Sequence, residues 1–142
     1  MVRDRQKRQL WLSQSSYIKK ITNQFRIDYS SKPPDTPILP AELLPSLDQA
    51  SQSSTLKYQS KTGSILYTAI TTRPDVAFAA SKLAQFNANP SQQHHEAADR
   101  TIQYLFHTRH TAICYTGKVV SQPLICASDA SFADDSTDRK SS

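Results

Sequence analysis

The first residues alternate between polar and apolar side chains, as residues of a β-hairpin do. In Arg3–Ser13, Leu10 and Leu12 alternate with Trp11, and the polar stretch 4–8 supplies a turn. A helix is predicted next, over Gln14–Phe25, with Ser13 as its N-cap. Its apolar stripe follows helical spacing and consists of Ile18, Ile21 and Phe25.

Residues 28–55 have a different character, because five of the eight prolines fall here among Ser, Thr, Asp and Gln. Proline removes amide donors and holds the preceding residue extended. This pattern predicts a linker or a long surface loop. Inside it, Leu43, Leu44 and Leu47 suggest one short helical turn.

Three helical segments are predicted after this loop. The first is Lys57–Thr71, in which Gly63 either breaks the helix or permits a close helix crossing. Pro74 starts the second helix, because proline is favoured at the first helical position. Ser91 is a plausible N-cap for the third, which runs to about Arg109. The expected buried stripes are Val76, Ala79, Ala80, Leu83 and Phe86 in the second helix and His94, Ala98, Ile102 and Leu105 in the third.

Two short strands are predicted after the helices. Thr111–Thr116 is rich in β-forming residues, and Leu124–Ala130 is apolar until it reaches Asp129. We expect them to pair, although a two-stranded sheet is marginal alone. The expected fold class is therefore α+β, divided into residues 1–27, 28–55, 56–109 and 110–142.

The charge distribution adds a functional hypothesis. The chain has 142 residues and a net charge of +5, and 37% of its residues are apolar. Residues 1–26 hold seven basic residues against Asp4 alone. Such a segment is suited to a polyanion, and an ordinary solvated basic surface is the alternative. The candidate contact residues are Arg3, Arg5, Lys7, Arg8, Lys19 and Lys20.

Asp129 is the strongest candidate for metal chemistry. A carboxylate at the end of an apolar strand is costly unless it is paired or binds a cation. Three more carboxylates follow, and carboxylate oxygens are the ligands that Mg²⁺ prefers. A solvated acidic loop is the alternative for these three residues, which are Asp134, Asp135 and Asp138.

Other candidate sites are weak. His94 and His95 are adjacent on a predicted helix and point about 100° apart, so a zinc site there is not expected. Cys114 and Cys126 fit two small buried side chains better than a disulfide framework. A Gly-rich phosphate loop and the Tyr-x-Asp-Asp signature of nucleotidyl transfer are both absent from the sequence.

No apolar run is long enough for a membrane span, and no apolar signal region follows the basic start. We expect no membrane partner and an intracellular location, with cytoplasm and nucleus both open.

Four ordered motifs resemble the copia-type retrotransposon Pol polyproteins, at the end of the reverse transcriptase region where it runs into ribonuclease H. The first is R-D-R followed by L-x-L-S-Q-x-x-Y-I, and the second is G-S-L-x-Y followed by T-R-P-D-I-A. The third begins N-P-x-x-x-H-W-E-A, and the fourth is S-D-A followed by D-R-K-S. The matching positions here are Arg3–Arg5 with Leu10–Ile18, Gly63–Tyr67 with Thr72–Ala77, Asn89–Thr108, and Ser128–Ala130 with Asp138–Ser141.

The resemblance implies a role for each part. Residues 14–109 are similar to the polymerase thumb and connection, helices that grip the template–primer duplex through its backbone. Arg73, in the second motif, joins the candidate contact residues. Residues 110–142 resemble the start of ribonuclease H, in which Asp129 matches the first Mg²⁺-binding carboxylate. The implied fold is thus a short hairpin, a thumb-like bundle and a truncated ribonuclease H-like strand pair.

The sequence also departs from the family. His95 stands where Trp is usual, and Ser131, Phe132 and Asp134 replace the family's Asp, Trp and Gly. The family's catalytic palm would precede Met1, and its other ribonuclease H ligands would follow Ser142. We therefore expect no polymerase or nuclease activity from this chain alone, because one carboxylate does not hold two ions.

Three roles are left open for such a fragment. It binds RNA–DNA hybrid or duplex nucleic acid, it pairs with a full-length polymerase, or it is a relic without function.

Overall fold

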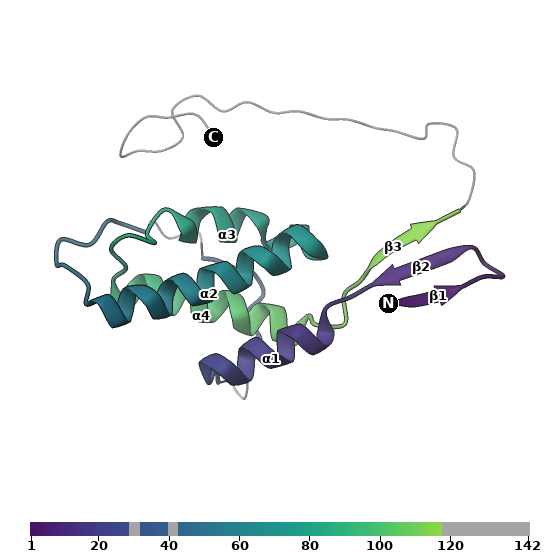
Figure 1. The fold of residues 1–142 in the computed structure, drawn as a ribbon, viewed down its shortest axis with the longest axis horizontal. Helices are drawn as coiled ribbons and strands as arrows, with labels where there is room; N and C mark the ends of the chain where they lie inside the picture. The colour runs from purple at the N-terminus through teal and green to yellow at the C-terminus, as the bar shows by residue number, and fades with distance from the viewer. Residues whose placement is uncertain (29–31, 40–42, 118–142) are drawn as a thin grey trace, which may run out of the picture.

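The computed structural model describes residues 1–28, 32–39 and 43–117, and these ranges hold four α-helices and three strands. The α+β class is therefore confirmed. Figure 1 shows the helices gathered in one bundle and the strands extending away from it at one end.

The N-terminal hairpin is confirmed. Strand β1 (Val2–Asp4) pairs antiparallel with β2 (Gln9–Leu12), and Val2 lies opposite Trp11. The intervening loop closes with a bond from Arg8 N to Arg5 O, while Arg8 adopts a φ of 53°. Asp4 Oδ1 accepts a hydrogen bond from Lys7 N at 3.0 Å, which also stabilises this turn.

Helix α1 (Ser15–Phe25) carries the expected stripe, with Ile18 and Ile21 buried. Its N-cap is Gln14, and no side chain caps the helix, so the expectation for Ser13 was wrong.

Helix α2 (Gln52–Thr71) begins five residues earlier than predicted, because Ser51 caps it by accepting a bond from Ser54 N. Gly63 does not break it. A Cβ placed on Gly63 would meet nothing within 4 Å, so no described segment crosses the helix closely there. Both expectations for this glycine were wrong.

Two side chains donate hydrogen bonds to backbone carbonyl groups of the proline-rich segment and hold it against the bundle. Thr101 Oγ1 donates to Pro37 O at 2.9 Å, and Asn89 Nδ2 donates to Ser46 O and Asp48 O. These bonds satisfy backbone carbonyl groups that lie outside any helix or strand and so have no backbone partner there. The helical turn expected at Leu43, Leu44 and Leu47 does not form.

The remaining helices match the sequence patterns closely. Pro74 opens the short 3-10 helix η1 (Pro74–Val76), which leads into α3 (Ala77–Ala84). Ser91 caps α4 (Gln92–His107) and forms a capping box with His94. The expected stripes of both helices are buried except for Phe86, which is half-buried. Together with α1 and α2 they enclose the core, formed by Ile18, Ile21, Ile27, Tyr58, Ile65, Ala69, Val76, Ala80, Leu83, Ala98, Ile102 and Leu105.

The last described strand joins the hairpin. Strand β3 (Ile113–Thr116) pairs antiparallel with β2, in the sheet order β1-β2-β3, and Trp11 lies opposite Cys114. Residues 113–116 therefore share a sheet with the N-terminal hairpin. The pairing expected between residues 111–116 and 124–130 lies outside the described residues, as does Cys126. Cys114 is exposed, which corrects the expectation that it is buried.

Candidate nucleic-acid interface

The four expected contact residues of the hairpin are all exposed. Arg3 lies on β1, and Arg5, Lys7 and Arg8 lie in the loop that joins β1 to β2. The only carboxylate of the hairpin, Asp4, already accepts the backbone bond from Lys7. The loop therefore presents three cationic side chains within four consecutive residues.

The two cations of α1 are also exposed, away from the stripe that packs on the bundle. Lys19 and Lys20 follow the buried Ile18 directly, and Ile21 follows them. Helical geometry turns successive side chains by about 100°, so burying Ile18 and Ile21 leaves the two lysines in solvent.

None of these six cations forms an ion pair within residues 1–28, 32–39 and 43–117. The ion pairs found there join Lys61 to Asp99 and Arg73 to Asp75. The hairpin and α1 thus present cations that the described carboxylates do not neutralise, and a polyanion is the natural counterpart of such a surface.

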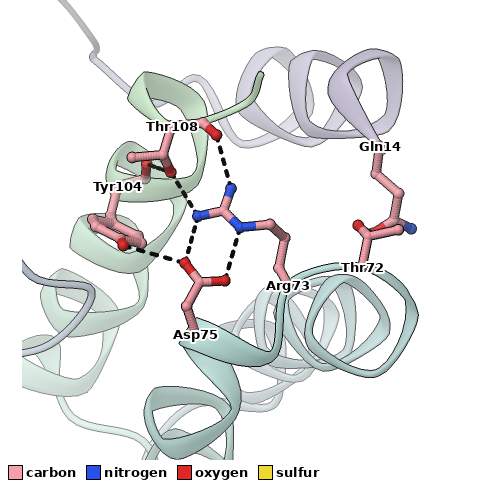
Figure 2. A network of polar contacts seen from close by, with 6 residues as sticks. All are labelled: Gln14, Thr72, Arg73, Asp75, Tyr104 and Thr108. Carbon is pink, nitrogen blue, oxygen red and sulfur yellow. Dashed lines mark hydrogen bonds and ion pairs between the residues drawn. The ribbon is translucent and has the colours of Figure 1, made fainter. Parts of the chain in front are cut away.

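Arg73 has a different environment from the other six cations. Its side chain is 1% exposed and its guanidinium makes two bonds to Asp75, from Nε at 2.9 Å and from Nη2 at 2.6 Å. It also donates to Thr108 O at 3.1 Å and to Thr108 Oγ1 at 2.6 Å (Figure 2). These contacts engage four of the five guanidinium N–H groups, so Arg73 does not lie with the exposed cations, and its contact with nucleic acid stays a prediction.

The partly exposed side chains of Asp75 and Tyr104 complete this network around the buried Arg73. The Arg73 guanidinium holds the pKa of the Asp75 carboxyl below its usual value, so the pair stays charged. Tyr104 donates to Asp75 Oδ2 at 3.2 Å, and its ring centre lies 5.6 Å from the guanidinium carbon. Asp75, Tyr104 and Thr108 were not among the site residues predicted from the sequence. Arg73 and Asp75 flank the helix-starting Pro74, and this spacing was the signal in the sequence that could have indicated their ion pair.

His94 and His95 both contact aromatic side chains of the bundle. His94 is fully buried, and its ring stacks on Phe86 with centroids 3.9 Å apart. His95 Nε2 lies 3.0 Å from Ser54 Oγ, and its ring meets that of Tyr58 edge to face. Among the described residues, no group of three His, Cys, Asp or Glu side chains is placed to hold a metal ion.

Asp129, Asp134, Asp135 and Asp138 lie outside the described residues. Within the described part of the chain, every helix is too short or too polar to cross a bilayer.

Comparison with known proteins points to transposon polyproteins. No protein-family model and no solved structure matches the chain. It is 34% identical over 149 residues to the retrovirus-related Pol polyprotein from transposon TNT 1-94 of Nicotiana tabacum, a match covering 100% of the chain. It is 32% identical over 130 residues to the corresponding polyprotein from transposon RE1 of Arabidopsis thaliana, covering 91% of the chain.

A putative transposon Ty5-1 protein of Saccharomyces cerevisiae is 31% identical over 116 residues, which cover 81% of the chain and 37% of that protein. The chain spans 11% of the tobacco polyprotein and 9% of the Arabidopsis one. The relatives that match over most of the chain thus include two retrovirus-related Pol polyproteins from transposons, and the chain corresponds to a segment of such a retrotransposon polyprotein.

Proposed function

We propose that the hairpin and α1 grip the backbone of a nucleic-acid duplex, as the thumb of a reverse transcriptase does. The observation that carries this proposal is the set of six exposed cations that no described carboxylate pairs. Phosphate contacts by Lys and Arg position a protein on a duplex and read little of its sequence. An RNA–DNA hybrid is the substrate that the family resemblance implies.

The salt dependence of binding tests this proposal. The probe is a fluorescently labelled RNA–DNA hybrid, and the measurement is anisotropy between about 50 and about 200 mM salt. Six phosphate contacts give a slope of about −5 in a plot of log K against log salt, and a loss of about a thousandfold over that range. Absence of binding at low salt would refute the proposal.

A matched pair of double variants locates the contact surface. Replacing Lys19 and Lys20 by Gln removes two contacts and reduces the magnitude of the slope by about 2. Replacing Lys32 and Lys57 by Gln changes the net charge equally at two other exposed positions and leaves the slope as it was. Equal effects from both variants would indicate a general response to charge and not this surface.

Catalysis is not part of the function proposed for residues 1–117. We propose that Asp129 binds Mg²⁺ when a complete ribonuclease H domain surrounds it, which follows from the resemblance alone. Purified chain, Mg²⁺ and a labelled hybrid should yield no Asp129-dependent cleavage.

Exposed apolar side chains favour a second candidate, pairing with a full-length polymerase. Leu66, Tyr67 and Ile70 on α2 are 47%, 49% and 75% exposed, and Phe78 on α3 is 65% exposed. Leu66 and Ile70 are four residues apart and so share one face of α2, and an exposed apolar face is typical of a protein contact. Co-purification with a related full-length polymerase, lost on replacing Ile70 and Phe78 by Ser, supports this candidate, and absence of co-purification excludes it.

A further inference from the structure

The three strands form an arm on which none of the described helices packs. The arm is defined here as β1, β2 and β3, and the bundle as α1, α2, η1, α3 and α4. No residue of the three strands is fully buried, and no described helix packs against either face of the sheet (Figure 1). Short connections join the arm to the bundle at two points, residues 13–14 and residues 108–112.

The first connection is bonded to Thr72. Thr72 Oγ1 donates to Gln14 Oε1 at 2.8 Å, and Thr72 is only 4% exposed. Gln14 occupies the N-cap of α1, a position that favours Ser, Thr, Asp or Asn. Its side chain makes no capping bond and extends to Thr72 instead, as Figure 2 shows. The contact between Gln14, at the start of α1, and Thr72, after the end of α2, therefore explains why a residue that caps helices poorly stands at this position.

The second connection is bonded to Arg73. Thr108 is the C-cap of α4, and its carbonyl accepts from Arg73 Nη1 and from Thr111 N, two residues before β3 begins. The guanidinium is itself fixed, because Asp75 binds it through both carboxylate oxygens. Arg73 thus bonds to the last ordered turn before the chain enters the arm.

Both contacts come from one corner of backbone. Thr72 N and Arg73 N donate to the same acceptor, Thr68 O, at 3.2 and 3.1 Å, and Pro74 follows at once with a restricted φ. Two consecutive residues of a constrained turn therefore hold the two points where the arm leaves the bundle.

We propose that Thr72 and Arg73 are positioning residues that fix the orientation of the arm relative to the bundle. Fixing this orientation also sets where the hairpin cations lie relative to Lys19 and Lys20. The consequence for binding rests on the proposed duplex grip, whereas the orientation itself does not.

The orientation is measured in the free protein. Spin labels go on Gln6→Cys in the hairpin loop and Ser81→Cys on α3, both exposed positions, in a chain where Cys114 and Cys126 are Ser. Pulsed electron paramagnetic resonance then gives the distribution of distances between arm and bundle. Thr72→Val removes the hydroxyl with little change in shape and should broaden or shift this distribution. Thr72→Ser retains the hydroxyl and should restore it.

A second pair of variants guards against unfolding at the buried Thr72. Gln14→Ala removes the acceptor at a half-buried position and should reproduce the Thr72→Val distribution, while Gln14→Glu keeps an oxygen acceptor and should not. A wild-type distribution in folded Thr72→Val and in Gln14→Ala would overturn the proposal. Circular dichroism and Tm show whether each variant is folded.

The binding measurement separates the two proposals. Thr72→Val should lose about five- to tenfold in affinity for the hybrid at fixed salt, the effect of one hydrogen bond, and Thr72→Ser should not. Unchanged affinity together with a changed distribution would overturn the binding consequence alone. Absence of binding by the wild type would refute the duplex grip, and the distance measurement would still decide the role of Thr72.

Discussion

Single residues in this chain show how local sequence and tertiary contact compete. Gly63 lies in the middle of α2 and is exposed, and nothing surrounds the space where a side chain would sit. Gly117 is different, because a Cβ there would lie 2.9 Å from Arg8 Nε and 3.1 Å from Arg8 Cβ. One glycine has no described structural need, and the other allows the chain after β3 to approach the hairpin.

Gly63→Ala should therefore stabilise the protein. Alanine loses less backbone entropy on folding into a helix, which predicts a gain of about 0.5–1 kcal/mol in the free energy of unfolding. Urea denaturation followed by circular dichroism measures this gain. Gly117→Ala is the control and should give no gain, since Arg8 must move to accommodate it. Loss of stability in Gly63→Ala would mean that an unseen contact requires the glycine.

His94 and His95, near the start of α4, make stability depend on pH. Burial lowers the pKa of His94 below its usual value, and His94 Nδ1 accepts from Ser91 N at 2.9 Å, which a protonated ring does not do. Burial, and then the positive charge of Lys61, lowers the pKa of His95. The unfolded chain thus binds more protons below pH 6.5, the value of a free histidine. The stabilisation is complete above that pH and is lost as pH falls through the folded pKa values.

The Tm should accordingly fall as the pH drops from about 7.5 to about 5. His94→Gln should start from a lower Tm and show a shallower decline, because one of the two titrating groups is gone. His110→Gln, at an exposed position outside the helix, should leave the decline unchanged. Identical declines in wild type and His94→Gln would contradict this explanation.

At the scale of elements, helix ends differ in how well sequence predicts them. Ser51 and Ser91 each cap a helix through the side-chain oxygen, as their residue type favours. Ser13 does not, because Gln14 takes the N-cap of α1 and contacts Thr72. A contact between residues 58 positions apart thus overrides the local preference.

Ser91→Ala should destabilise the protein by about 1 kcal/mol, because α4 loses its side-chain cap. Ser91→Asp keeps an oxygen acceptor for His94 N and adds a negative charge at the positive end of the helix, so it should retain most of the stability. Chemical denaturation of the two variants beside wild type measures the difference. Equal losses in both would show that the Ser91 hydroxyl has another role.

At the scale of the whole molecule, the bundle and the arm differ in burial. The bundle encloses residues such as Tyr58, Ile65 and Leu105 at 0% exposure, whereas the arm has no buried residue. Exposing the amides of a packed core to solvent requires a large free energy of unfolding. Exposing the amides of an uncovered sheet requires a smaller one.

The rates of amide hydrogen exchange should therefore differ between the bundle and the arm. Amides of α2 and α4 should exchange most slowly, and those of β1 and β3 should exchange faster, with β2 between them because it pairs on both sides. Mass spectrometry of peptic fragments resolves these regions. Slower exchange in the arm than in α4 would show that another part of the chain covers the sheet.

The sequence by itself determined the hairpin, the stripes of α3 and α4, the buried Ile18 and Ile21 of α1, the Ser91 cap and the exposure of the six cations. The apolar residues expected to pack in α2 are mostly exposed, and of these only Ile65 is buried. Periodicity and capping act over a few residues, so they are visible in a local pattern. The role of Asp129 and the thumb-like assignment stay predictions from resemblance.

Only the tertiary structure decided where Arg73 lies, which residue Gln14 contacts and which strand pairs with β3. Each depends on segments far apart in the chain: Thr108 is 35 residues from Arg73, and β3 follows β2 after all four helices. By residue type alone, an arginine such as Arg73 could contact either a phosphate or a carboxylate of its own chain. Burial decides between them, because a guanidinium that loses its water needs a partner of opposite charge within the protein.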